Sequence, residues 1–282
     1  MTIAIRQSSS EHKNPNIKET AANTGENNLD WLKRVRSGRR EQGGLILLGG
    51  TSVSHFRVRS AQAQLRRDLM PSFWSMVGIM MDETNFVSVP LGLRQDNAEV
   101  PFNNAVQDCS LEQYANPENF PNIAVIDFTD SFDSIDENIK LIKSQRSVVD
   151  LPSLLLPWLG HVWGAGQASN PLLMGQGLPS AVFTETVYGL AGIELTPGLS
   201  SSSSCPEAIW VSANWWHDFY DAAMQVDNQP QSFDDAAKGS EETAEGAEPT
   251  TENTQAQAFS RAEAIIPRGD FTLRQPAAAI KG

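Results

Sequence analysis

Cysteine and histidine are scarce in this chain. Its 282 residues include two cysteines, Cys109 and Cys205, and four histidines. Two thiols cannot form a disulfide-dense secreted scaffold or a four-cysteine zinc site. No two histidines have the HxH or HxxxH spacing of a metal site. The glycine-rich stretches at residues 164–167 and 175–178 match neither a Walker loop nor a dinucleotide fingerprint. We therefore expect no metal centre and no cofactor.

Basic residues and long apolar runs are also few. The chain has 34 acidic and 21 basic residues and a formal net charge of −13. This balance argues against non-specific nucleic-acid binding, which needs Lys and Arg to neutralise phosphates. The longest apolar stretches, at residues 45–48 and 151–162, are shorter than the ~20 residues of a membrane span. No signal peptide or lipidation motif is visible in the first 26 residues. We expect a cytoplasmic protein with reduced cysteines, no membrane span and no nucleic-acid partner.

Composition divides the chain into four regions. Residues 1–28 are polar with little apolar periodicity, which predicts a disordered N-terminal arm. Residues 29–225 hold most of the apolar side chains and predict a single domain. An acidic flexible linker is expected over residues 226–256, because residues 227–252 contain eight acidic residues and one Lys. The tail at residues 257–282 contains an apolar patch, either a docking segment or a partly ordered end.

Short apolar runs alternate with helical patterns in the central region. Runs bounded by Gly, Pro or Asp predict strands over residues 44–48, 76–81, 86–89 and 122–128. Helical spacing predicts helices over residues 29–40, 55–70, 135–147, 180–190 and 206–224. The strands do not alternate regularly with the helices. We therefore expect an α+β fold with a small antiparallel sheet packed against helices.

Four residues are candidates for nucleophilic catalysis. Cys205 directly precedes a predicted helix, whose dipole would favour the thiolate. Ser180 also lies at the start of a predicted helix. His55 and His161 are the candidate bases, since a nucleophile needs a base within hydrogen-bond reach. Each of these residues can also have a purely structural role. Cys205, Ser180 and His55 can simply stand at the starts of helices, and His161 can be a buried, hydrogen-bonded core residue.

Three short motifs resemble a known family. G-G-L-I-L-L at residues 43–48 resembles the G-D-I-I-L-V opening strand of circularly permuted papain-like proteins, the YiiX-like branch of the NlpC superfamily. S-M-V-G-I at residues 75–79 resembles their S-H-V-G-I strand with the catalytic His. P-S-A-V-F at residues 179–183 and A-G-I-E-L-T-P at residues 191–197 resemble their nucleophile helix and the A-G-I-x-L-x-P segment after it. Over residues 43–225 the resemblance implies a permuted papain-like fold.

The chain departs from this family at both catalytic positions. Met76 stands at the position of the His, and Pro179 at that of the Cys, or Ser180 if the register shifts by one. A thioether takes no proton at neutral pH, and proline has no nucleophile. The resemblance therefore implies a pseudoenzyme whose cleft persists as a ligand groove lined by Met76, Pro179, Phe183 and Trp163.

We expect a binding or regulatory module for a peptide, an acyl group or a protein partner. The alternative is a thiol or serine hydrolase acting on amide or ester bonds, with Cys205 or Ser180 as nucleophile and His55 or His161 as base. A phage or virion structural component is a third class that the composition permits. Basic residues at 33–40 and 57–67 are further candidate contacts for an acidic partner.

Overall fold

The computed structural model describes six segments of the chain: residues 1–7, 19–38, 42–91, 104–127, 132–164 and 168–227. Residues 1–229 form one compact unit, and residues 230–282 are a second unit outside the described segments. The predicted tail at residues 257–282 therefore lies outside the described residues. So does the predicted linker, except for residues 226 and 227.

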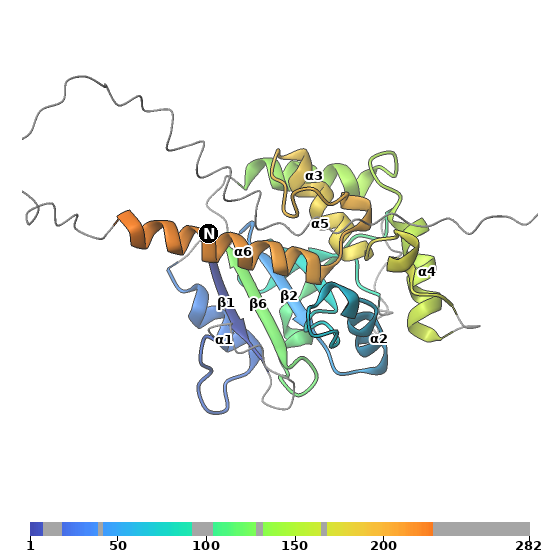
Figure 1. Cartoon of the computed structure of the whole chain (residues 1–282). Coiled ribbons are helices and arrows are strands. Elements are labelled where there is room, and N and C mark those ends of the chain that lie inside the picture. Colours follow the sequence, from blue (N-terminus) through green and yellow to red (C-terminus); the bar gives the residue numbers. More distant parts are fainter. Residues whose placement is uncertain (8–18, 39–41, 92–103, 128–131, 165–167, 228–282) are drawn as a thin grey trace, which may run out of the picture. The chain divides into compact units, whose positions relative to one another are not determined.

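Six antiparallel strands form one sheet in the order β1-β6-β2-β3-β4-β5 (Figure 1). Their bounds are Thr2–Arg6 for β1, Leu45–Gly49 for β2, Met76–Met80 for β3, Asn85–Ser88 for β4, Gln107–Ser110 for β5 and Asn122–Asp127 for β6. The four strands predicted from apolar runs are all present, as β2, β3, β4 and β6. The expected α+β class is confirmed.

Six α-helices accompany the sheet within the described residues. Their bounds are Asn28–Arg36 for α1, Val53–Ala61 for α2, Asp133–Ser144 for α3, Leu151–Trp163 for α4, Pro179–Leu190 for α5 and Pro206–Asp227 for α6. Four 3-10 helices lie between them: η1 at Ala63–Leu65, η2 at Leu111–Tyr114, η4 at Pro171–Met174 and η5 at Ser201–Ser203.

Each face of the sheet has its own apolar cluster, because successive strand side chains point to opposite faces. Leu47 and Val77 point to the face covered by helices α2 to α6 and belong to the larger cluster. Met76 points to the opposite face and belongs to the cluster with Trp31 of α1 and Leu111 of η2. The sheet thus lies between a thick helical layer and a thin one.

The first residues of the chain form strand β1, so the prediction of a disordered arm over residues 1–28 is wrong for them. Residues Thr2–Arg6 pair with β6 at the edge of the sheet, and Ala4 and Ile5 are buried on opposite faces. Burial of this short apolar stretch and its pairing with β6 offset the entropy of ordering it. Residues 8–18 of the predicted arm lie outside the described segments.

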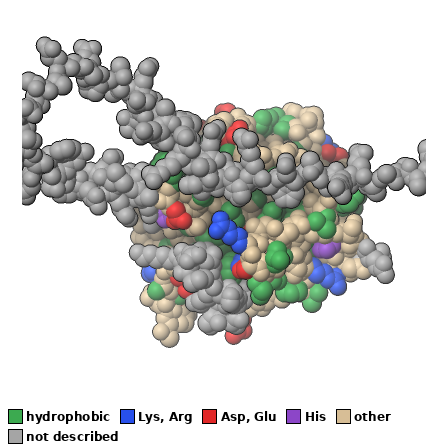
Figure 2. Space-filling view, in the orientation of Figure 1, with side chains coloured by type: hydrophobic (Ala, Val, Ile, Leu, Met, Phe, Trp, Pro, Cys, Tyr) green, Lys and Arg blue, Asp and Glu red, His purple; other side chains and the backbone are tan. Residues whose placement is uncertain are grey.

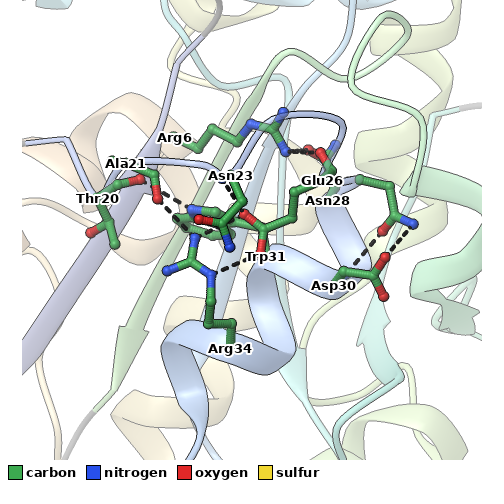
Figure 3. A network of polar contacts seen from close by, with 10 residues as sticks. Arg6, Thr20, Ala21, Asn23, Glu26, Asn28, Asp30, Trp31 and Arg34 are labelled. Carbon is green, nitrogen blue, oxygen red and sulfur yellow. Dashed lines mark hydrogen bonds and ion pairs between the residues drawn. The ribbon is translucent and has the colours of Figure 1, made fainter.

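A polar network holds residues 19–27 against helix α1 (Figure 3). Arg34 donates two hydrogen bonds of 2.8 Å to the Glu26 carboxylate, and Arg6 of β1 donates to the Glu26 carbonyl at 2.9 Å. The Arg34 hydrogen bonds lower the pKa of Glu26 to about 2. The Asn27 side chain caps α1 by accepting from the Asp30 amide.

Two helices differ from prediction. The helix expected over residues 55–70 ends at Ala61, because the chain turns back toward β3 and the Gln62 side chain donates to the Val58 and Trp74 carbonyls. Helix α4 was not predicted because it contains two prolines. One lies in its first turn, where no N–H is needed, and Pro157 lies inside it. Gly164 ends α4 in the left-handed conformation, with φ of 67°.

Candidate functional site

The start of helix α5 packs against strand β3, where the resemblance places the two catalytic positions. Pro179 and Ser180 begin α5 and are buried. The Ser180 hydroxyl accepts a long hydrogen bond, 3.5 Å, from the Val77 amide of β3. Ser180 has 1% of its surface exposed, so a substrate cannot reach its hydroxyl in this structure. Ser180 joins the helix to the sheet and is not an accessible nucleophile.

The predicted ligand groove does not form between α5 and the sheet. Met76 and Phe183 are both buried, but they belong to apolar clusters on opposite faces of the sheet. Pro179 is buried as well. Trp163 is exposed at the end of α4, as a surface side chain. The prediction failed because neighbouring residues in a strand point to opposite faces, so Val77 rather than Met76 faces α5.

Cys205 is not an activated thiol. It directly precedes α6, as predicted, but its side chain is fully buried in the larger apolar cluster. Burial, with a smaller contribution from the nearby Glu207 charge, raises the pKa of the Cys205 thiol to about 12, although backbone hydrogen bonds oppose the rise. The expectation that the helix dipole would favour the thiolate is therefore wrong, since desolvation outweighs it.

His55 forms a pair with Ser75 that the sequence analysis missed. His55 Nδ1 lies 2.8 Å from Ser75 Oγ, and this hydroxyl also donates to the Leu48 carbonyl and accepts from the Gly50 amide. Burial lowers the pKa of His55 to about 4, and the Arg59 charge adds to the effect. Ser75 is itself buried. Because the Ser75 hydroxyl is buried and already takes part in three hydrogen bonds, the pair joins α2 to the ends of β2 and β3 rather than presenting a nucleophile.

His161 lies on a different helix from His55 and is not a fully buried core residue. His161 lies near the end of α4. Its Nδ1 lies 3.5 Å from the Ala168 carbonyl oxygen, and its ring makes an edge contact with the Trp158 ring. No group of three or more His, Cys, Asp or Glu side chains suited to a metal ion occurs among the described residues. These contacts do not bring a base together with either candidate nucleophile.

The most distinctive surface feature is a row of aromatic side chains on α6, which we call the α6 aromatic surface: Trp215, Trp216, Phe219 and Tyr220. Trp215 stacks on Phe219 with the rings 13° from parallel, and Trp216 stacks on Tyr220 at 27°. Trp215, Phe219 and Tyr220 are each about half exposed, at 47%, 50% and 54%. This density of exposed aromatic side chains is typical of an interaction surface.

The course of α6 explains this exposure. The first half of α6 packs on the sheet and contributes Ile209, Trp210 and Ala213 to the larger apolar cluster. The helix contacts the edge strand β1, and its C-terminal turns run on beyond that edge (Figure 1). Trp215 lies about 140° and Phe219 about 180° around the helix from buried Trp210, so both rings face away from the larger apolar cluster. The helix was predicted from its apolar spacing, but the exposure of its second half was not.

Exposed hydrophobic side chains elsewhere are of a different kind. On the face shown in Figure 2, hydrophobic side chains are scattered among polar ones, and charged side chains of both signs occur. Phe56 of α2 and Leu156 and Trp163 of α4 are examples of such exposed hydrophobic residues. Single exposed hydrophobic residues are common on soluble proteins and need no partner.

Comparisons with known proteins assign neither a family nor a function to the chain. No protein-family model, curated protein or solved structure matches the chain. None of the helices in the described residues is both long enough and apolar enough to cross a membrane.

Proposed function

We propose that this chain is a non-catalytic binding domain, built on a degenerate permuted papain-like plan, that uses its α6 aromatic surface to bind a basic amphipathic helix of a protein partner. The observation that carries the proposal is the set of stacked, half-exposed aromatic rings on α6. The packing of α5 against β3 supports the papain-like plan, because the resemblance implies a helix start in contact with that strand.

Binding rather than catalysis is supported by the state of the candidate catalytic groups. Cys205 is buried with a raised pKa, and Ser180 is buried under β3. The imidazole of His55 is hydrogen-bonded to the buried Ser75 hydroxyl, and its lowered pKa makes it a weak base. A hydrolase needs an accessible nucleophile with a base beside it.

The size of the surface favours a helical segment over an obligate dimer. Aromatic side chains have roughly 150–250 Å² of surface each. Trp215, Phe219 and Tyr220, at about half exposure, therefore offer on the order of 300 Å². An obligate homodimer buries about 1,000 Å² or more on each partner. A patch of this size is suited to the apolar centre of a smaller interface, where Trp and Tyr contribute most of the affinity.

Charge favours a basic partner. Residues 206–227 contain four acidic residues and no Lys or Arg. A second copy of this chain would bring the same acidic helix, and like charges across an interface are unfavourable. A partner helix with Leu or Phe on one face and Arg or Lys at its edges would bury its apolar side chains on the rings. Its cations would lie near Asp218 and over the face of Trp215.

Calorimetric titration with two synthetic helical peptides tests this function. Both carry the same Leu and Phe face, one flanked by Arg and Lys and the other by Glu. We expect micromolar binding of the basic peptide and at least tenfold weaker binding of the acidic one. Trp215→Ala should weaken the basic peptide at least tenfold, whereas Trp163→Ala, which removes an equally exposed Trp from α4, should change affinity less than twofold.

Three results would contradict the proposal. They are equal affinity for both peptides, an unchanged affinity in Trp215→Ala, and a concentration-dependent dimer that Trp215→Ala abolishes. The last result, measured by sedimentation without peptide, would identify a second copy of this chain as the occupant of the surface.

A further inference from the structure

A pocket of about 550 Å³ opens beside the C-terminal half of α5, apart from the groups discussed above. Its walls come from α5, from the loop that follows it, and from the segment that enters η5. The residues that line it include Glu185, Gly189, Leu190, Ile193, Glu194 and Leu199. The sequence analysis assigned no role to this region beyond its part in the family resemblance.

A buried carboxylate lies in the wall of this pocket. Glu185 has 6% of its surface exposed. Its Oε1 accepts hydrogen bonds from the Thr196 hydroxyl at 2.6 Å and the Ser204 hydroxyl at 3.0 Å. These bonds come from the loop after α5 and from the residue after η5, so the carboxylate is fixed relative to both. Burial raises the pKa of Glu185, while the hydrogen bonds of Thr196 and Ser204 oppose the rise.

The pocket lining supplies negative charge and apolar surface, but no cation. Glu194 is a second carboxylate in the lining, and its charge also raises the pKa of Glu185. None of the residues that line the pocket is Lys, Arg or His. Leu190, Ile193 and Leu199 add aliphatic surface to the lining. A cationic ligand would offset both the desolvation of Glu185 and the repulsion between the two carboxylates.

We propose that this pocket binds an aliphatic primary ammonium group, with its nitrogen on the Glu185 carboxylate and its methylene chain against Leu190, Ile193 and Leu199. An anion is repelled by both carboxylates, and a neutral alcohol leaves the charge of Glu185 uncompensated. An ammonium group donates three hydrogen bonds on a short apolar stem. The same chemistry occurs in free diamines and in the Lys side chain of a polypeptide.

Titration monitored by NMR tests the site in the full chain. The probes are 1,5-diaminopentane, n-pentanol of similar chain length, and an acetylated and amidated Gly-Lys-Gly peptide. We expect saturable shifts of the amides around Glu185 and Thr196 with the ammonium probes and not with pentanol. Glu185→Gln, which keeps the shape and removes the charge, should weaken ammonium binding at least tenfold. Glu118→Gln, an exposed acid elsewhere, should leave it unchanged.

A second variant keeps both carboxylates and blocks the pocket. A Cβ added at Gly189 meets no atom within 4 Å, so Gly189→Leu is tolerated in α5 and places its side chain at the pocket. It should also weaken binding at least tenfold. Gly160→Leu is the matched control in α4, where an added Cβ meets only the Ala168 methyl at 3.9 Å.

The two ammonium probes distinguish the sources of the ligand. Tighter binding of the peptide points to a Lys of a polypeptide, and tighter binding of the diamine points to a free amine. Either order supports the site. The proposal is overturned if pentanol binds as well as the diamine, if Glu185→Gln binds it like the wild type, or if no saturation occurs up to tens of millimolar.

Discussion

The two halves of helix α6 differ in almost every respect that bears on function. The first half, with Cys205 directly before it, is enclosed: Glu207, Ile209 and Trp210 are all buried. From Trp215 onward the helix carries the α6 aromatic surface, in which Trp215, Phe219 and Tyr220 are each about half exposed. The residues with reactive chemistry are therefore in the part that solvent cannot reach. The exposed part offers large apolar rings, which bind but do not react.

The first prediction concerns the reactivity of Cys205, where the largest effect is expected. With a pKa of about 12, the thiolate fraction at pH 8 is on the order of 10⁻⁴, and the thiol is also inaccessible. In a Cys109→Ser background, iodoacetamide should label native Cys205 at least a thousandfold more slowly than the unfolded chain. Mass spectrometry of timed samples measures both rates. A native rate within tenfold of the unfolded rate would mean that the first half of α6 is open.

The second prediction compares two of the three tryptophans on α6, Trp210 and Trp215. Trp210 is buried, and its ring centre lies 5.1 Å from that of Trp74. Trp210→Ala should lower the free energy of unfolding by roughly 3–5 kcal/mol, because it leaves a cavity. Trp215→Ala removes a half-exposed ring and should lower it by less than about 1 kcal/mol. Urea unfolding followed by circular dichroism measures both, and equal losses would remove the distinction between the halves.

The third prediction concerns the buried hydroxyl that faces the start of α6. Ser72 Oγ donates to the Glu207 carboxylate at 2.6 Å and accepts from the Trp74 amide at 2.9 Å. Ser72→Ala leaves both groups without this partner in a buried place and should cost about 1–3 kcal/mol of stability. Ser169→Ala, at an exposed position, is the control and should change stability by less than about 0.5 kcal/mol. The same urea experiment applies, and a cost for Ser72→Ala no greater than the control would contradict the account.

The fourth and smallest effect is a pH dependence in the first half of α6. Burial raises the pKa of Glu207, while the Ser72 hydrogen bond opposes the rise. A raised pKa means that this group's contribution to stability is complete below pH 4.5 and declines as pH rises through the folded-state pKa. Unfolding free energies measured from pH 4 to 8 should therefore fall less steeply in Glu207→Gln than in the wild type.

Much of the fold was predictable from the sequence, because apolar runs and helical spacing report burial directly. Strands β2, β3, β4 and β6 were predicted, and α3, α5 and α6 were found within a few residues of their ends. Strand β1 was missed because its alternation spans five residues in a polar context. Strand β5, with the sequence QDCS, has no apolar pattern that would reveal it.

The candidate site was much less predictable, because it depends on which side chains the tertiary structure encloses. The position of Cys205 directly before a helix is typical of an activated thiol. Only the tertiary structure shows that the thiol is buried, so that desolvation outweighs the effect of the helix dipole on its pKa. His55 and Ser75 are 20 residues apart, so their contact has no local signal. The α6 aromatic surface had a signal that went unused. Residues 210 and 215 are five positions apart, which turns them about 140° from each other on a helix.

The indole N–H signals of the seven tryptophans show where on the domain the partner helix binds, since each signal depends on the surroundings of its own ring. The basic amphipathic peptide is titrated into the ¹⁵N-labelled full chain, and the signals are assigned by single Trp→Phe replacements. Our account predicts that the indole signals of Trp215 and Trp216 shift and saturate, while buried Trp31, Trp74, Trp158 and Trp210 and exposed Trp163 stay in place. If Trp163 moves instead, or if the peptide shifts no indole of α6, the α6 aromatic surface is not where the domain binds.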